Sequence, residues 1–482
     1  MTLVARNIVQ LALALSVALT AGLALMIILA VGRRRRRDRH FKRLDTLREN
    51  LGPLVSAIVA GDMDYLRGLS ALEQLRGYDR THMLERLCLE QHPTPEQLPV
   101  LLKLCEDLGL VQQWQRNLMG QEQRELLRDS IRRPGGLVEH MSEFSFLLRA
   151  QSAENLRLIR HEASWPLLAN ALDDSHPDVR RVAARALGTL AVPESFPALV
   201  RRLHALVIEP QATISVRVLK TALVGFPLER AQDLVPSLNH AHPRIRFLAT
   251  DTVREMVERR AALESDFALR LHLFPRKLAE IFLLRLPFDA SADVRARAAP
   301  VIAYLPEQTP DSLGAAGLDV EPADVLTRLL DDPQWFVRLH AVRALGKPRY
   351  AALTPRITRR LSDPNWRVRE AAARALVATG PSGIDSLIEH LVTTRDRYSQ
   401  EQIIEELEQS NLIPSLLDRY GQGTGAREGR ALETFVNLGK ISSIERILQN
   451  GVNPDVRRKF WMDFRAHPDR RVHAWAKRVT GN

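Results

Sequence analysis

Few side chains in this sequence have the types and spacing that catalysis or metal binding would require. Cys88 and Cys105 are the only cysteines, and two thiols cannot complete a four-ligand zinc site without histidines at matching spacing. We expect both to be reduced thiols on helical segments. His240 and His242 stand in a predicted turn between helices, which indicates solvated residues. The glycines of 421–425 follow no predicted strand, so they do not predict a phosphate-binding loop. The sequence therefore predicts no catalytic residue, no metal ligand and no cofactor.

Two tryptophans and two arginines have the character of binding residues instead. Trp335 and Trp366 occupy equivalent positions in a repeated pattern, and Arg343 and Arg374 occupy a second pair of equivalent positions. Tryptophan and arginine are the residues that most often dominate binding energy at protein interfaces. We expect the four on neighbouring units, where they would contact an acidic, partly apolar protein partner. The sequence leaves one alternative open, in which the tryptophans cover a junction and the arginines are solvated.

The elements that must position these residues come from a short pattern that recurs along the chain. It reads Val or Ile, Arg, two variable residues, two small residues, one variable residue and two apolar residues. Apolar residues at helical spacing, repeated at intervals of roughly 30 to 50 residues, predict two-helix units stacked into a solenoid. Strand signals are weak, so we expect an all-α fold. The copies begin at Val179, Val216, Ile245, Val294, Val337 and Val368.

One copy illustrates why such a segment forms a helix. Asp363 can cap the helix, and Pro364 suits its first position because the N–H there has no partner to lose. Val368, Ala372 and Leu376 then fall on one face. In four copies an aspartate stands six residues before the arginine of the pattern: Asp174/Arg180, Asp289/Arg295, Asp332/Arg338 and Asp363/Arg369. The copies at 216 and 245 have Gln211 and His240 there.

This pattern resembles the HEAT repeat, and more closely the HEAT-like repeats of the phycobilin lyase group. The resemblance covers roughly residues 152–395, and the C-terminal tail more weakly. It implies a ladder in which the aspartate of one turn and the arginine of a second helix link neighbouring units. The two copies without the aspartate would interrupt that ladder.

Some HEAT-like proteins are enzymes, and the resemblance makes their activities an alternative. Deoxyhypusine hydroxylases hold two irons with several His-Glu pairs at equivalent repeat positions, whereas this chain has one such dipeptide, His161-Glu162. The dipeptides at 139–140 and 389–390 are reversed and out of register. No motif can be assigned to the handling of a chromophore. We expect a protein that is not an enzyme, with a HEAT-like enzyme of the lyase or hydroxylase kind as the alternative.

The N-terminal end predicts a membrane anchor. Residues 7–32 carry no charge, and a helix of that length reaches about 39 Å, more than the roughly 30 Å hydrocarbon core. A secretory signal would have a shorter apolar core and a cleavage site. Because basic residues stay on the cytoplasmic side, we expect a single-pass protein of the inner cell membrane with its bulk in the cytoplasm. The residues that follow the apolar stretch directly are Arg33, Arg34, Arg35, Arg36 and Arg37.

The charge of the chain is concentrated beside this predicted anchor. Residues 1–43 hold nine of the 68 basic residues and one of the 57 acidic ones, so the remainder is nearly balanced. The cluster suits anionic lipid headgroups, and the balanced remainder argues against nucleic-acid binding. A row of small residues every four positions, from Ala14 to Gly22, can let two membrane helices pack closely. A homodimer through the anchor is thereby left open.

We therefore predict a membrane-tethered HEAT-like α-solenoid that binds a protein partner. Its role would be a scaffold or adaptor that helps to assemble or regulate a membrane-associated complex. The predicted organisation is a short extracytoplasmic N-terminus (1–6), a transmembrane helix (7–32), a basic juxtamembrane segment (33–43), a divergent helical capping region (44–150), HEAT-like repeats (151–395) and degenerate C-terminal helical repeats (396–482).

Overall fold

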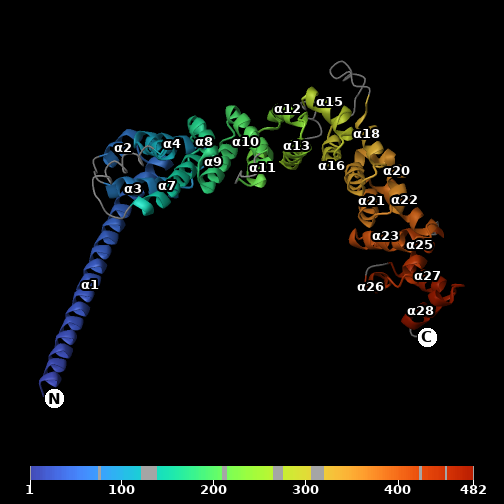
Figure 1. The fold of residues 1–482 in the computed structure, drawn as a ribbon. Coiled ribbons are helices and arrows are strands. Elements are labelled where there is room, and N and C mark those ends of the chain that lie inside the picture. Colours follow the sequence, from blue (N-terminus) through green and yellow to red (C-terminus); the bar gives the residue numbers. More distant parts are fainter. Residues whose placement is uncertain are drawn as a thin grey trace. The chain divides into compact units, whose positions relative to one another are not determined.

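The computed structural model of the protein describes residues 2–73, 78–120, 138–208, 214–263, 275–305, 320–422, 426–450 and 453–480. All regular elements in these ranges are helices, which confirms the predicted all-α class (Figure 1). The chain divides into two compact units. The first comprises Met1–Leu199 with Thr213–Ala222, and the second comprises Val200–Ala212 with Leu223–Asn482.

The first unit begins with the long helix α1 (Thr2–Ala60), whose last turns enter the core. Leu51, Val55 and Ile58 are buried there, and α1 packs on α2, α3 and α4. Further along, α7 packs on both α5 and α9. The other helices of this unit are α2 (Tyr65–Glu73), α3 (Tyr78–Glu90), α4 (Leu98–Asp107), α5 (Leu110–Leu118), α7 (Val138–Leu158), η1 (Glu162–Ser164), α8 (Trp165–Asn170), η2 (Ala171–Asp173), α9 (Pro177–Leu190), η3 (Pro193–Ser195) and most of α11 (Val216–Val224).

The second unit follows the predicted two-helix pattern. The second helices of successive repeats, α13, α16, α19 and α21, pack each on the next. Its helices include most of α10 (Phe196–Ile208), η4 (Leu228–Leu234), α12 (Val235–Leu238), α13 (Pro243–Leu263), α15 (Arg276–Leu284), η6 (Leu286–Phe288), α16 (Ala292–Ile302), α18 (Pro322–Leu329), α19 (Trp335–Leu345), η7 (Pro348–Leu353), α20 (Thr354–Thr358), η8 (Arg359–Ser362), α21 (Trp366–Ala378), α22 (Pro381–Thr393), α23 (Arg397–Gln409), α24 (Ile413–Gly421), α25 (Ala426–Asn437), α26 (Ser442–Asn450), α27 (Pro454–Arg465) and α28 (Arg470–Thr480).

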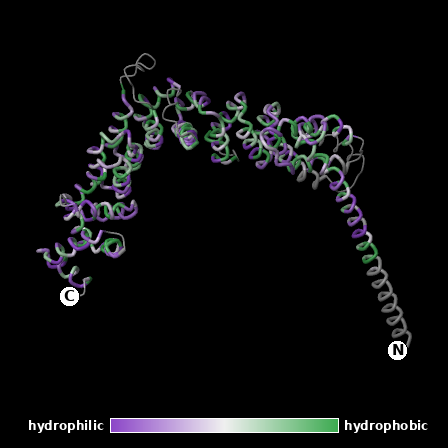
Figure 2. Tube along the Cα trace, turned by 180° about the vertical axis from the view of Figure 1, so that it is seen from behind, coloured by the Kyte–Doolittle hydropathy of each residue, from purple (hydrophilic) through white to green (hydrophobic). Residues whose placement is uncertain are grey.

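Helix α1 overturns the predicted membrane anchor. The predicted span, residues 7–32, lies largely outside the residues whose side chains the structure describes. Among the residues that it does describe, no helix is both long enough and apolar enough to cross a membrane. Along α1, the part of the helix that Figure 2 colours passes from an apolar stretch, Met26 to Gly32, into a hydrophilic one that begins at Arg33. The predicted single-pass localisation in the inner membrane is therefore wrong.

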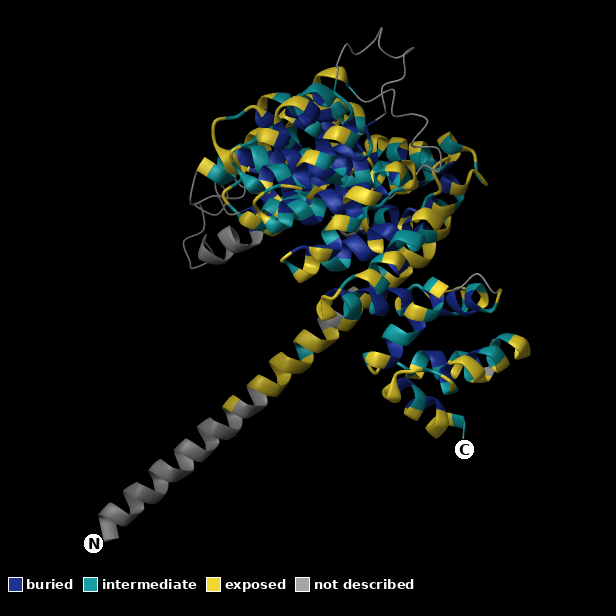
Figure 3. Ribbon diagram, turned by 90° about the vertical axis from the view of Figure 1, so that its right-hand side faces the viewer, coloured by how far each residue is buried: buried dark blue, intermediate teal, exposed yellow. Residues whose placement is uncertain are grey.

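Small residues let the second helices of neighbouring repeats approach closely, and the buried positions gather between the helices (Figure 3). A Cβ atom added to Gly188 would lie 2.5 Å from the Cα and 2.8 Å from the carbonyl oxygen of Ala222. A Cβ on Gly346 would meet the Cβ of Ala375 at 3.0 Å. Only glycine fits at position 188, because the opposing atoms belong to the backbone and cannot rotate away.

This close approach predicts the effect of adding one methyl group. Gly188→Ala should destabilise the first unit by about 1–3 kcal/mol, the usual cost of overpacking, even though alanine favours a helix more than glycine does. Thermal unfolding followed by circular dichroism measures the change. Arg185→Ala, at an exposed position on the same helix, is the matched control and should leave the melting temperature nearly unchanged. A Gly188→Ala protein that melts at or above the wild-type temperature would contradict the packing described here.

Candidate functional site

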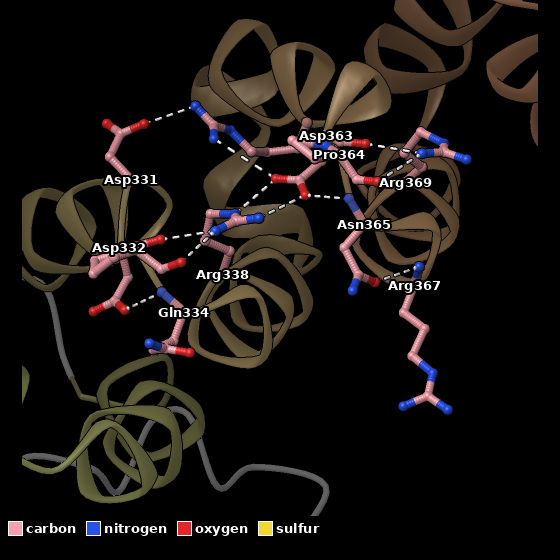
Figure 4. A network of polar contacts seen from close by, with 11 residues as sticks. Asp331, Asp332, Gln334, Arg338, Asp363, Pro364, Asn365, Arg367 and Arg369 are labelled. Carbon is pink, nitrogen blue, oxygen red and sulfur yellow. Dashed lines mark hydrogen bonds and ion pairs between the residues drawn. The ribbon is translucent and has the colours of Figure 1, made fainter.

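A buried ion pair joins each of several repeats to the next, and the pair between Arg338 and Asp363 is the most enclosed (Figure 4). Arg338 donates from Nε and Nη2 to the two carboxylate oxygens of Asp363, at 2.7 and 2.8 Å. Its Nη1 donates to the backbone carbonyl of Asp332, at 2.9 Å. The Asp363 side chain is fully buried and that of Arg338 is 11% exposed. One guanidinium therefore holds the turn of its own repeat and the aspartate of the next.

The same arrangement recurs, so the ladder between neighbouring units that the resemblance implied is confirmed. In every rung Nε and the carboxylate are 2.6 or 2.7 Å apart. The aspartate also accepts the N–H two residues further on, as Asp363 does from Asn365 at 2.9 Å. Within the first unit one rung joins α7 to the turn before α9. The rungs are Arg149–Asp174, Arg246–Asp289, Arg295–Asp332 and Arg338–Asp363.

The rung between Arg246 and Asp289 shifts the pKa of both members towards the charged form. At Asp289, burial opposes ionisation, but the hydrogen bonds from Arg246 and from the N–H of Ser291 outweigh it and lower the pKa below 3.8. At Arg246 the hydrogen bond to Asp289 raises the pKa despite burial. Both groups therefore remain ionised in the folded protein, which strengthens the hydrogen bonds between them.

The ladder stops where the expected partner is replaced by an uncharged residue. The N–H of Leu219 donates to the carbonyl of Ser215, as the N–H of Arg180 does to His176. Leu219 is thus buried at the arginine position, and Arg217 is exposed. The copy of the pattern that seemed to begin at Val216 therefore begins two residues later, at Val218. The sequence allows both alignments because a valine stands at each of the two positions.

At the other end, Thr394 replaces the aspartate. Its hydroxyl accepts the N–H of Asp396 at 3.2 Å, as Asp363 accepts that of Asn365, but it cannot neutralise an arginine. In the preceding repeat, Arg369 still donates from Nη1 to the carbonyl of Asp363 at 2.9 Å. The Nε atoms of Arg180 and Arg369 have no hydrogen-bond partner among the described residues.

The structure brings the two predicted tryptophans together around a third residue that the sequence pattern did not single out. Trp335 and Trp366 are the first residues of α19 and α21. The guanidinium of Arg367 lies 5.3 Å from the centre of each ring, within the range of cation–π attraction. Trp366 is 54% exposed, and Trp335 is half-buried. We call these three residues the tryptophan edge.

The two predicted arginines do not join the tryptophan edge. Arg343 lies eight positions after Trp335 on α19, which corresponds to about 12 Å along a helix, and Arg374 lies equally far along α21. Arg343 is exposed. Arg374 is 53% exposed but is engaged by two carboxylates, Glu370 at 2.8 Å and Glu406 at 3.4 Å. Arg367 has no carboxylate partner among the described residues, so it is the cation available beside the rings. The only sequence signal for it was its place next to Trp366.

The residues considered for metal or redox chemistry have structural partners. The ring of His161 is buried, with Nδ1 2.7 Å from the hydroxyl of Ser164. His240 and His242 each accept a backbone N–H two residues further on, at 3.0 and 3.2 Å. Over the described part of the chain, no three His, Cys, Asp or Glu side chains are grouped so that they could hold a metal ion.

The remaining predicted positions lie away from this region. Cys88 and Cys105 are buried free thiols, and a hydrogen bond between them, together with burial, raises the pKa of Cys105. Arg33, Arg34 and Arg35 are exposed on α1, whereas the side chains of Arg36 and Arg37 lie outside the described residues. Residues 423–425 of the glycine segment lie outside them too.

Residues 136–207 and 322–408 match the family model of HEAT repeats. The HEAT resemblance read from the sequence is confirmed over these ranges. The search of curated proteins found no match.

The fold is similar to that of several solved proteins at low sequence identity. An engineered protein is 17% identical, with 69% of this chain and 94% of that chain covered and a TM-score of 0.32. Human deoxyhypusine hydroxylase in complex with glycerol is 18% identical, covering 55% and 91%, at a TM-score of 0.21. Kap121p is 13% identical, covering 89% and 54%, at a TM-score of 0.33. Scores this low support no inference about function.

Removing one member of a rung should lower the stability of the fold far more than removing one member of an exposed ion pair. Asp363→Ala leaves the buried guanidinium of Arg338 without its carboxylate, and we expect the free energy of unfolding to fall by about 3–5 kcal/mol. The matched control is Asp331→Ala, because Asp331 is 65% exposed in its pair with Arg360, and this change should cost about 1 kcal/mol or less. Hydrogen exchange of the α19 and α21 amides measures both. Equal loss of protection in the two variants would contradict the assigned role of the ladder.

The lowered pKa of Asp289 predicts an acid-dependent stability. Because folding depresses this pKa, the stabilisation is present above the unfolded value of about 4 and is lost as the pH falls through the folded value. Asp289→Asn should reduce stability at pH 7 and flatten its decline below pH 4. Melting temperatures recorded at a series of pH values test this. An acid decline as steep as that of the wild type would show that Asp289 does not contribute to it.

Proposed function

We propose that these HEAT repeats form a protein-binding scaffold or adaptor, with the tryptophan edge as its contact site. HEAT-repeat solenoids are typical of scaffold and protein-binding proteins. The observation that carries the proposal is the exposed ring of Trp366, which lies beside the guanidinium of Arg367. Among the described residues that guanidinium has no carboxylate partner. The partner would be bound to help assemble or regulate a complex.

The chemistry of the tryptophan edge supports an acidic partner segment with an apolar side chain. Trp366 offers a large apolar face, which becomes favourable to bury once a partner covers it. Arg367 has no carboxylate partner among the described residues, so an incoming Asp or Glu would meet an unneutralised guanidinium. Nearby Arg360 is already paired with Asp331 at 2.7 Å. The tryptophan edge therefore supplies one apolar and one cationic contact side by side.

The ladder makes the tryptophan edge rigid before any partner arrives. Asn365 caps α21 by accepting the N–H of Arg367 at 3.0 Å, and its own N–H is held by Asp363. Since Asp363 is tied to Arg338, the first turns of α19 and α21 are fixed relative to each other. A preorganised surface loses little conformational entropy on binding, which favours its use as a contact site.

Several parts of the sequence-based prediction are not included in this proposal. The predicted lipid contacts of the arginine cluster and the homodimer have no supporting observation among the described residues. The membrane location of the complex is left out because no helix among the described residues could cross a membrane. The alternative, a HEAT-like enzyme of the lyase or hydroxylase kind, has no observation among the described residues that favours it, and closeness to the phycobilin lyase group stays a prediction. We propose binding without catalysis.

A displayed peptide library tests the proposal without assuming which protein binds. Peptides selected on the wild-type chain should be acidic and should contain at least one large apolar residue. Trp366→Ala should weaken their binding by about 2 kcal/mol or more, roughly 30-fold. Arg367→Glu should slow association and reverse its dependence on salt, because charges at the rim steer encounter. Surface plasmon resonance measures both rates.

The control must be an exposed aromatic residue elsewhere in the same unit. Tyr398 on α23 is 71% exposed, and Tyr398→Ala should leave the affinity unchanged. All variants should keep the wild-type melting temperature. If the selected peptides bind Trp366→Ala as tightly as wild type, the tryptophan edge is not the contact site.

A further inference from the structure

The first unit contains a cavity that none of the predicted functions uses. It lies where the end of α3, the loop of residues 91–97, the start of α4 and the end of α7 meet, and its volume is about 460 Å³. Small-molecule sites in proteins typically enclose roughly 300–1,000 Å³. The cavity is therefore large enough for a small organic ligand.

Aliphatic side chains form one continuous part of the cavity wall. Five of the side chains that line it belong to leucine or isoleucine, and they come from three different helices or their ends. Leu101 and Ile159 are buried in the core, whereas Leu158 is 44% exposed. An aliphatic chain would find a continuous apolar surface here. The aliphatic residues are Leu89, Leu98, Leu101, Leu158 and Ile159.

The charged group of the cavity is a single cation. Arg160 lines the cavity and is exposed, and no carboxylate partner is found for it among the described residues. None of the described lining residues is an aspartate or a glutamate. The polar lining side chains otherwise include His92 and Thr94, which can donate hydrogen bonds, and Gln91, whose amide already donates to the carbonyl of Leu87 at 3.1 Å. The cavity therefore favours an anion over a cation or a neutral polar group.

The backbone at Arg160 shows that the arginine is not needed for the turn. Its φ is +54°, and the N–H of His161 donates to the carbonyl of Leu156 at 3.0 Å, which is the way many helices end. Glycine is the residue best suited to this conformation. After α9, Ala191 takes the same role with a φ of +51°. A charged side chain at 160 is therefore explained better by the cavity than by the helix end.

We propose that this cavity binds a short- to medium-chain aliphatic carboxylate. The hydrocarbon chain would lie against the leucines and Ile159, and the carboxylate would accept charge-assisted hydrogen bonds from Arg160. Among the described residues, the lining contains no Lys and no second Arg that would match a larger polyanion. The proposal is independent of the tryptophan edge, which belongs to the second unit.

Calorimetric titration of the full chain with octanoate tests this proposal. The wild type should bind octanoate saturably, and 1-octanol, which has a chain of the same length without the charge, should bind at least tenfold more weakly. Arg160→Gly should weaken octanoate binding by about tenfold or more, because it removes the charge-assisted hydrogen bonds. Its melting temperature should not fall, because glycine suits a positive φ.

Two further variants separate loss of the ligand site from loss of structure. Ala191→Gly makes the matching change at the end of α9, and octanoate affinity should be unchanged. Leu158→Glu places a like charge at an exposed position of the cavity wall, and octanoate binding should be lost. The proposal is overturned if the wild type shows no saturable binding at millimolar octanoate. It is equally overturned if the Arg160→Gly protein, folded as judged by its melting temperature, binds octanoate like the wild type.

Discussion

The bidentate ion pair between an arginine of one repeat and an aspartate of the next is the interaction on which the rest of the structure depends. Two buried charges are costly to desolvate, and they stabilise a fold only when their geometry is good and their remaining hydrogen-bonding groups are satisfied. In this chain both conditions hold. Arg338 uses Nε and Nη2 on Asp363 and Nη1 on its own turn, while Asp363 also accepts a backbone N–H. The charged groups therefore set the register between repeats and also stabilise the fold.

This constraint explains why the repeats tolerate variable first helices. The stretch before α21 is split into the short helices η7, α20 and η8, whereas α21 itself is regular. The second helices set the position of each repeat relative to its neighbours. They do so through the rungs and through small residues such as Ala372, which allow close packing. Where a rung is missing, as at Leu219, apolar burial and the glycine contact at Gly188 remain. The first helices can therefore vary in length without disturbing the stack.

The candidate site depends on the same interaction. Trp335 and Trp366 begin helices whose first turns are held by aspartates of the ladder, so their rings are presented from a rigid base. Arg367 bridges the rings because it directly follows one of them and its side chain extends away from the ladder. The cavity of the first unit is built differently, from helix ends and a loop, and its cation stands on a turn with a positive φ. The tryptophan edge and the cavity therefore differ both in construction and in chemistry.

The sequence alone determined the local features of this protein. Helical periodicity, Asp-Pro turns and alternating small and apolar residues predicted an all-α repeat structure, because these signals depend only on residues within one or two helical turns. It also identified Trp335 and Trp366 as equivalent positions. Its prediction of a single-pass protein of the inner membrane is contradicted, because no helix among the described residues is long and apolar enough to cross a membrane.

Only the tertiary structure decided how the repeats meet. Arg246 pairs with Asp289, 43 residues away, whereas Arg338 pairs with Asp363, 25 residues away. No fixed spacing predicts both, since the intervening helices and loops differ in length. The same uncertainty hid the shifted register at Leu219, the place of Arg367 between two rings and the cavity beside Arg160. The last two are contacts between segments far apart in the chain, and local patterns carry no information about such contacts. The register at Leu219 was hidden because the local pattern fits that segment in two positions.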